Sequence, residues 1–160
     1  MMAIPVIPSR QWRGPSCRLR GMCALPDQSA SALPPYAQSI GIFIHGEEDG
    51  APVLGFEFTG DVEGRPQHLH GGATSGLLET AGYALLRKEL ERAGRKHRLK
   101  PINITAQFLS AGKQKTTYAK ARIIKLGRRN ANILVEAWQD NRSRPIATAI
   151  MNILMSDPDN

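Results

Sequence analysis

The sequence predicts an α+β domain in which an antiparallel sheet wraps around one long central helix. Residues 72–90 carry apolar or small side chains at helical spacing. Segments on both sides of that stretch alternate apolar and polar residues, with the period of two that is typical of strands. Short polar turns join the later segments, as in antiparallel hairpins. One helix must therefore be covered by one sheet.

The chain is long enough for one such domain, preceded by a segment of different composition. The 160 residues suffice for a single core. Residues 1–35 hold six prolines and show no helical or strand period, so we expect this segment to be disordered. Two alternatives are a true translation start at Met22, which would make the upstream residues an annotation artefact, and a targeting peptide. The domain itself is expected to span residues 36–160.

Each predicted element follows from a local pattern. Residues 39–45 and 51–59 predict a hairpin, because an acidic turn closed by a glycine separates them. Charged residues from Arg87 onward mark where the helix reaches water, and Gly94 ends it. The remaining strands are expected at residues 101–109, 116–126, 132–139 and 145–155, with turns at residues 127–130 and 140–143.

The net charge of +7 favours a negatively charged partner. Four arginines lie in the first twenty residues, and the other basic residues fall mainly in residues 92–100 and 113–129. Two local clusters suit a small polyanion as well as they suit a nucleic acid. Aromatic residues make up only 6%, and the clusters lack the repeated aromatics that base stacking needs. We therefore expect no nucleic-acid partner.

Several other classes are disfavoured by the composition. Both cysteines lie in the first 35 residues and lack metal-ligand spacing, so a reducing, cytoplasmic location is expected. No apolar run approaches the ~20 residues of a membrane helix, so no membrane partner is expected. His68 and His70 have no third ligand at suitable spacing, and no metal site is predicted.

Glu79 is a lone carboxylate within the apolar stripe of the helix. Burying a carboxylate is costly unless it is paired or hydrogen-bonded. One interpretation is that Glu79 faces a substrate and acts as a general base or as a nucleophile. The structural alternative is that it lies on the exposed edge of the helix and pairs with Arg87 or Lys88.

The motif His70-Gly71-Gly72, followed by an acid nine residues after His70, resembles the hotdog-fold acyl-CoA thioesterases of the phenylacetate-pathway type. The strand order and the turn at residues 127–129 fit the same family, over about residues 39–156. The resemblance implies a hotdog fold and hydrolysis of an acyl- or aryl-acyl-CoA to the free acid and CoA. It implies no cofactor, since CoA is part of the substrate, and a homodimer or homotetramer. Many members carry an Asn six residues before the His, where this chain has Gly64.

The resemblance also implies a role for each residue of the candidate site. Glu79 is the base or nucleophile, the Gly71 N–H is the oxyanion donor, and His70 shapes the loop. The active site lies at the dimer interface. Substrate contacts, including those to the CoA phosphates, are expected from Gly72, Arg95, Lys96, Arg128 and Arg129.

Three other functions are weighed against this one. A non-catalytic acyl-CoA-binding protein would share the fold and would bind CoA esters without turnover. A basic nucleic-acid-binding protein would bind oligonucleotides more tightly than CoA esters, with a strong salt dependence. A hotdog dehydratase is disfavoured, because its Asp and His pair is not found near the start of the helix.

Overall fold

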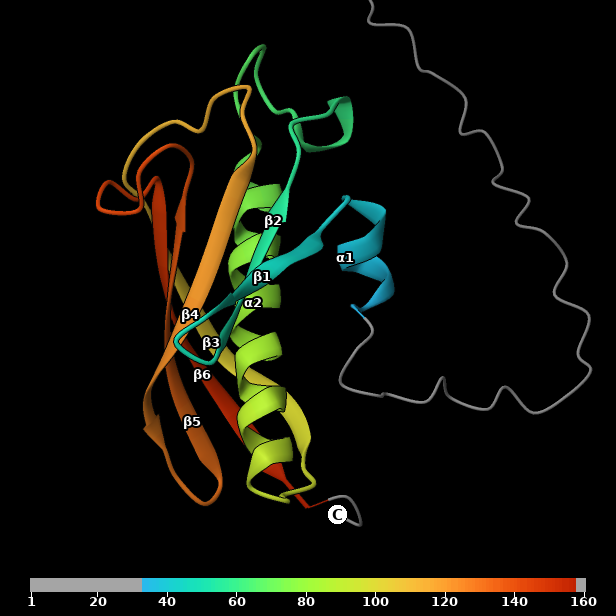
Figure 1. The fold of residues 1–160 in the computed structure, drawn as a ribbon, viewed down its shortest axis with the longest axis vertical. Helices are drawn as coiled ribbons and strands as arrows, with labels where there is room; N and C mark the ends of the chain where they lie inside the picture. Colours follow the sequence, from blue (N-terminus) through green and yellow to red (C-terminus); the bar gives the residue numbers. More distant parts are fainter. Residues whose placement is uncertain (1–32, 158–160) are drawn as a thin grey trace, which may run out of the picture.

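The computed structural model describes residues 33–157, and one antiparallel sheet curves around one long helix in it (Figure 1). The predicted α+β class is confirmed. Our expectation for residues 1–32 lies outside the described residues. The elements are α1 (Pro35–Ser39), β1 (Phe43–Glu48), β2 (Ala51–Phe56), the 3-10 turn η1 (Gly60–Val62), α2 (Gly71–Arg92), β3 (Arg98–Phe108), β4 (Thr117–Leu126), β5 (Asn130–Trp138) and β6 (Ala147–Ser156).

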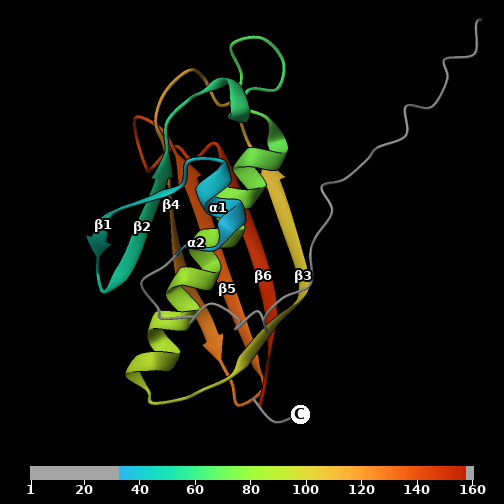
Figure 2. The same ribbon diagram turned by 90° about the vertical axis from the view of Figure 1, so that its right-hand side faces the viewer.

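The sheet has the strand order β1-β2-β4-β5-β6-β3, and every neighbouring pair is antiparallel. β3 follows α2 in the chain but lies beside β6 at the far edge of the sheet (Figure 2). Within residues 33–157, β3 therefore has a neighbouring strand on one side only. Its other side presents backbone N–H and C=O groups that no strand among residues 33–157 pairs.

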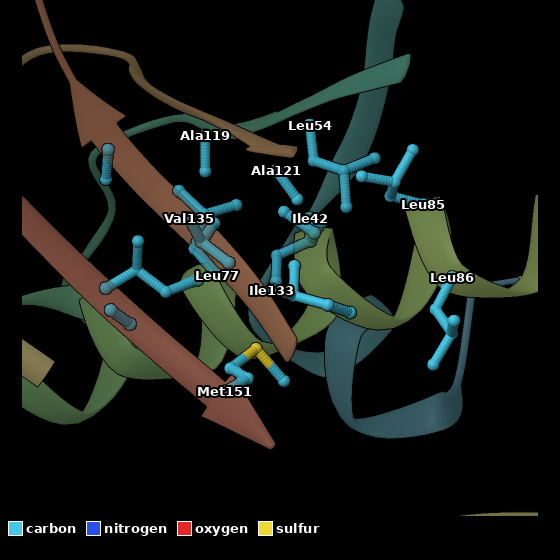
Figure 3. Packing of buried hydrophobic residues seen from close by; sticks show 14 of the residues in the cluster. Ile42, Leu54, Leu77, Leu85, Leu86, Ala119, Ala121, Ile133, Val135 and Met151 are labelled. Carbon is cyan, nitrogen blue, oxygen red and sulfur yellow. The ribbon is translucent and has the colours of Figure 1, made fainter. Parts of the chain in front are cut away.

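Helix α2 is held by its apolar face, which packs against the concave side of the sheet. Leu77 and Leu86 are fully buried, in the same cluster as Ile133, Val135 and Met151 of the central strands (Figure 3). Burial of one such leucine contributes about 2 kcal/mol. The predicted range of residues 72–90 is thus confirmed to within two residues at either end. Gly94, with φ +62°, ends the helix as predicted.

The short helix α1 was not predicted from the sequence. Two adjacent prolines indicated an irregular segment there, yet proline is favoured in the first turn of a helix, where no N–H is needed. Tyr36 lies over Gly76 of α2, whose missing side chain leaves room for the ring: a Cβ there would lie 2.6 Å from the Tyr36 hydroxyl. α2 is therefore covered by the sheet on one side and by α1 on the other (Figure 1).

Two predicted strand starts are corrected. β1 begins at Phe43 rather than at residue 39, because α1 occupies residues 35–39. β3 begins at Arg98 rather than at residue 101. Pro101 suggested a boundary, but a proline is tolerated inside an edge strand, where its nitrogen needs no partner. The pairing with β6 shifts register between Pro101 and Asn103.

Ion pairs hold the β1–β2 turn against the outer face of the sheet. Lys120 of β4 is buried, and its Nζ lies 2.6 Å from Oδ2 of Asp49 and 3.3 Å from Oε2 of Glu48. Arg142 donates to Glu48 at 2.8 Å and also to Glu136 at 2.6 Å. Because this network fixes the turn, the face of the β1–β2 hairpin that points towards α2 has a defined position.

The Lys120–Asp49 pair predicts a pH-dependent stability. The hydrogen bond from Lys120, and then its charge, hold the pKa of Asp49 below its usual range. Asp49→Asn removes the charge while keeping a residue that tolerates the left-handed φ of 53° at this position. A depressed folded-state pKa means that the stabilisation is fully present above the unfolded value of about 4 and is lost at lower pH.

The variant should therefore be less stable than the wild type near neutral pH. The difference should vanish as the pH falls through the lowered pKa of Asp49. Urea denaturation from about pH 2 to about pH 7 measures this. A difference in the free energy of unfolding that stays constant with pH would contradict the assignment.

Candidate active site

Glu79 lies on α2 and is half-buried in a groove of about 870 Å³. α2, α1, the β1–β2 hairpin and the start of β3 enclose this groove. Its walls are largely apolar, with Tyr36, Ile44, Leu54 and Leu99 among them. The carboxylate that interrupts the apolar stripe therefore faces a space large enough for a ligand, rather than the packed core.

The structural alternative for Glu79 is not supported. Lys88 makes its ion pair with Glu47 of β1. Among residues 33–157, no basic side chain lies within ion-pair distance of Glu79. The carboxylate is thus available to a ligand in the groove.

Tyr83 is a polar residue of the same groove whose position sequence reasoning missed. Tyr83 falls within the predicted helix of residues 72–90, and its spacing of four residues from Glu79 places the two side chains on one face. Burial, and then the negative charge of Glu79, raise the pKa of the Tyr83 phenol, while Arg87 opposes this shift. A neutral phenol O–H, which can donate a hydrogen bond, therefore lies beside the carboxylate.

The His70-Gly71-Gly72 motif forms the first turn of α2. His70 is the N-cap residue, and its Nδ1 accepts a hydrogen bond of 2.9 Å from the Gly72 N–H. The neutral ring then carries its proton on Nε2. Since the Gly72 N–H is used inside the motif, it is not available to a substrate. The role of His70 in shaping this loop stays a prediction, and the hydrogen bond to the Gly72 N–H is the contact through which it would act.

Gly71 is the first residue of the helix, so its N–H has no acceptor within the helix. No acceptor for it is found elsewhere in residues 33–157. Gly71 lines a second cavity, of about 360 Å³, together with Thr74 and Phe108. A free N–H at the positive end of a 22-residue helix is suited to stabilising an oxyanion.

Gly64, where many thioesterases of the phenylacetate-pathway type carry Asn, lies against His70. A Cβ at Gly64 would lie 3.0 Å from the Cα of His70 and 3.3 Å from its ring carbon Cδ2. The space next to residue 64 is therefore already filled by His70. The glycine at residue 64 and the position of the His70 ring therefore depend on each other, because a larger side chain at residue 64 would contact His70.

The predicted basic residues gather at the other end of α2. Arg95 donates to the carbonyl oxygens of Gly127, at 3.1 Å, and of Arg128, at 2.8 Å. This ties the end of α2 to the β4–β5 turn that carries Arg128 and Arg129. Over its 22 residues α2 spans about 33 Å, so within one chain the basic group is far from Gly71.

Gly71 and Glu79 of one chain are themselves too far apart to act on one carbonyl group. Eight residues of helix separate them by about 12 Å along the axis. A general base must reach the proton it takes directly or through one water molecule. The two groups also line different cavities.

Neither a metal-ligand cluster nor a membrane-spanning helix is found in residues 33–157. No group of three or more His, Cys, Asp or Glu side chains could hold a metal ion there. None of the helices in this range is both long and apolar enough to span a bilayer.

Comparison with known proteins identifies the family. Residues 66–146, just over half of the chain, match the model of the thioesterase superfamily. The chain therefore belongs to the thioesterase superfamily. A comparison with curated proteins gave no match.

Solved structures share the fold. A thioesterase variant from Staphylococcus aureus has 21% identity and a TM-score of 0.67, over 76% of this chain and 98% of that one. A phenylacetic acid degradation-related protein from Ralstonia eutropha has 20% identity and a TM-score of 0.66, over 79% and 94%. A variant of the phenylacetic acid degradation protein PaaI from Thermus thermophilus has 20% identity and a TM-score of 0.62, over 76% and 98%. The predicted resemblance and hotdog fold are confirmed.

The N-cap role of His70 predicts a measurable loss of stability. His70→Ala removes the acceptor of the Gly72 N–H and should lower the free energy of unfolding by about 1 kcal/mol. His70→Asn is the matched control, since asparagine is among the preferred N-cap residues and should retain most of the stability. Chemical denaturation of the three proteins tests this. Equal losses in both variants would show that the ring stabilises the loop in another way.

Proposed function

We propose that the protein hydrolyses an acyl- or aryl-acyl-CoA thioester to the free acid and CoA. The observation that carries this proposal is the unpaired Glu79 carboxylate in an apolar-walled groove. The free Gly71 N–H on the same helix adds an oxyanion donor. Membership of the thioesterase superfamily supports the reaction class.

Each group has a defined task in this reaction. Acting as a general base, Glu79 takes a proton from water while the water oxygen bonds to the carbonyl carbon. The negative charge that develops on the carbonyl oxygen is stabilised by the Gly71 N–H, a contribution of about 3 kcal/mol for one well-placed donor. The C–S bond then breaks, and the leaving thiolate takes up a proton to become the thiol of CoA. The alternative is direct attack by Glu79, which gives a mixed anhydride that water hydrolyses.

The reaction needs a second copy of the chain, because Gly71 and Glu79 of one copy cannot meet. We place Glu79 of one copy beside Gly71 of the other in a homodimer. Two such dimers can associate into a tetramer. The exposed edge of β3 supports this arrangement. On the side facing α2, this strand leaves Ile104 39% and Phe108 57% exposed. Pairing of two β3 strands would cover both residues.

The basic group at the end of α2 is assigned to the CoA phosphates. Antiparallel pairing of two β3 strands brings the C-terminal end of one α2 towards the N-terminal end of the other. The basic group of one copy then lies near the end of the second copy's α2 that carries Gly71. This group consists of Arg95, Lys96, Arg128 and Arg129. Guanidinium groups are natural partners of phosphates. The apolar groove is left for the acyl group.

A non-catalytic acyl-CoA-binding protein is the second candidate. The observation that favours it is Gly64, since the family's amide side chain is missing there and the His70 ring fills the space. Binding of CoA esters without turnover would decide for this candidate.

The role of Glu79 is tested by thiol release from short-chain, long-chain and aryl CoA esters. Glu79→Gln should lower kcat/KM by about 10²- to 10⁴-fold, because the amide cannot accept the proton from water. Glu91→Gln is the matched control: Glu91 lies on the same helix and lines the same groove, about three turns further on. Its activity should stay near that of the wild type. If Glu79→Gln retained most of the wild-type activity, Glu79 would be neither the general base nor the nucleophile.

The oxyanion role of Gly71 is tested by a pair of substitutions that differ in one N–H. Gly71→Pro removes the N–H, and proline is well accepted at the first position of a helix. His70 already has the extended backbone that a following proline requires, with φ −71° and ψ 134°. Gly71→Ala keeps the N–H, and its Cβ would be 3.5 Å from the Phe108 ring, an ordinary contact.

Gly71→Pro should therefore lower kcat about 10²- to 10³-fold relative to Gly71→Ala. Thermal unfolding of both variants checks that the helix start is intact. Equal kcat values in two folded variants would rule out the Gly71 N–H as the donor.

A further inference from the structure

Arg87 is a charged residue of the groove that the proposed reaction does not use. It lies on α2, about two turns beyond Glu79 and one turn beyond Tyr83, and its half-buried side chain lines the groove. Burial, and then the charge of Glu79, raise the pKa of the Tyr83 phenol, while the charge of Arg87 opposes this shift. The phenol is therefore within range of both charges, and Arg87 faces the same space as Glu79.

No side chain among residues 33–157 neutralises Arg87. It forms no ion pair in this part of the chain. The arginine side chains that donate hydrogen bonds here belong to Arg92, Arg95 and Arg142. A half-buried cation without a partner is costly, and an anion that binds it offsets this cost. Arg87 is therefore suited to binding an anionic group of a ligand.

The other charged residues near Arg87 leave it available. Lys88 pairs with Glu47 of β1. Glu91, one turn beyond Arg87, is exposed and lies outside ion-pair distance of it. A guanidinium group has five N–H donors, so it can bind a ligand even when Glu91 turns towards it.

The position of Arg87 differs from that of an ordinary surface arginine. Arg92, on the same helix, has a side chain that is 64% exposed, pairs with Glu89 and does not line the groove. Arg87 instead shares the groove with Ile44 and Leu54. Apolar walls of this kind suit methylene groups. The guanidinium suits a carboxylate, which it can bind through two parallel hydrogen bonds.

We infer that the acyl group of the substrate ends in a carboxylate, which Arg87 binds at the far end of the groove. The substrate class is then an ω-carboxyacyl-CoA, whose thioester reacts beside Glu79 while its methylene groups lie on the apolar walls. The inference rests on the proposed function, because Glu79 marks the place of the thioester only in a thioesterase. Arg87 is then a residue that determines specificity by contacting the substrate away from the reacting atoms.

The separation between Glu79 and Arg87 sets the length of the acyl group. Eight residues of helix separate them by about 12 Å along the axis. Hydrogen bonds at the two ends take up about 3 Å each. The remaining distance of about 6 Å corresponds to about five bonds of an extended chain, at about 1.2 Å per bond. The two side chains also lie about 80° apart around the axis, which lengthens the path. We therefore expect acyl groups of about six to ten carbons.

A phosphate of CoA is the other source of anionic oxygens for Arg87. The basic group at the end of α2, which lies outside the groove, is already assigned to the phosphates. The two sources also differ in a measurable way. A phosphate contact would be made by every CoA ester, whereas a carboxylate contact would be made only by esters that carry a terminal carboxylate.

The experiment compares matched pairs of esters by thiol release. Adipoyl-, suberoyl- and sebacoyl-CoA carry the terminal carboxylate, and hexanoyl-, octanoyl- and decanoyl-CoA have the same chain lengths without it. In the wild type, kcat/KM for the best carboxylate ester should exceed that of its partner by about 10- to 100-fold, the factor that a hydrogen bond to a charged group contributes. Arg87→Met keeps an unbranched side chain without the charge. It should abolish this preference and leave kcat/KM for the partner ester unchanged or higher.

Arg87→Lys and Arg92→Met are the control variants. Lysine keeps the charge but loses the paired hydrogen bonds, so Arg87→Lys should retain part of the preference. Arg92→Met removes an arginine outside the groove and should retain all of it. Thermal unfolding checks that each variant is folded.

Three results would overturn the inference. The first is a wild type that hydrolyses the carboxylate esters no faster than their partners. The second is an equal preference in the wild type and in Arg87→Met. The third is an equal loss in Arg87→Met on both members of each pair, which would assign Arg87 to a phosphate of CoA.

Failure of this inference and failure of the proposed function give different results. Titration calorimetry of the same ester pairs measures binding without turnover. Suppose that the protein hydrolyses none of the esters but binds the carboxylate esters more tightly, and that Arg87→Met abolishes the difference. The thioesterase function would then be contradicted, and the carboxylate site would stand. Hydrolysis of the esters without a terminal carboxylate alone would support the function and contradict the carboxylate site.

Discussion

One rigid helix carries both the carboxylate and the backbone donor of the candidate site, and the rest of the structure depends on that constraint. α2 is straight and packed on two sides, so it cannot bend to bring Gly71 and Glu79 together. Chemistry that needs both groups must draw them from two helices. Under the proposed function, a second copy would use the β3 edge, which no strand within residues 33–157 pairs, and the apolar residues beside it.

The packing of α2 also explains why Glu79 is accessible. The sheet covers the leucine face, while α1 covers only the part of the helix around Gly76. Between α1 and the β1–β2 hairpin the helix stays open, and Glu79 and Tyr83 line that opening. Lys120 and Arg142 hold the hairpin turn on the outer face of the sheet, and Glu47 of β1 pairs with Lys88 of α2 on the other side. These ion pairs fix the hairpin, which forms one wall of the groove.

Much of the fold could be predicted from periodicity, because each strand and the long helix bury one face. α1 and the true start of β3 could not. In both cases a proline that indicated a boundary instead occupies a position where no N–H is needed. The motif at residues 70–72 and Glu79 were found from the sequence, and the predicted helix already implies that about 12 Å separates Gly71 from Glu79. Pairwise contacts such as the hydrogen bond from the Gly72 N–H to His70 depend on rotamers and loop paths. The hydrogen bonds from Asn132 to Asn152 and from Asn152 to Asn103 likewise join strands that no spacing pattern links.

The wall of the groove and the carboxylate that faces it belong to different elements of the structure. Leu33, Pro34 and Tyr36 form part of the groove wall, whereas the carboxylate belongs to α2. Substitutions in this short segment can change the width of the groove without moving the groups proposed to react. Under the proposed function, selection for a different acyl group can therefore act on a few residues at the start of the domain without changing the groups proposed to react. In the proposed function, the segment formed by Leu33, Pro34 and Tyr36 would thus adjust substrate choice independently of the reacting groups on α2.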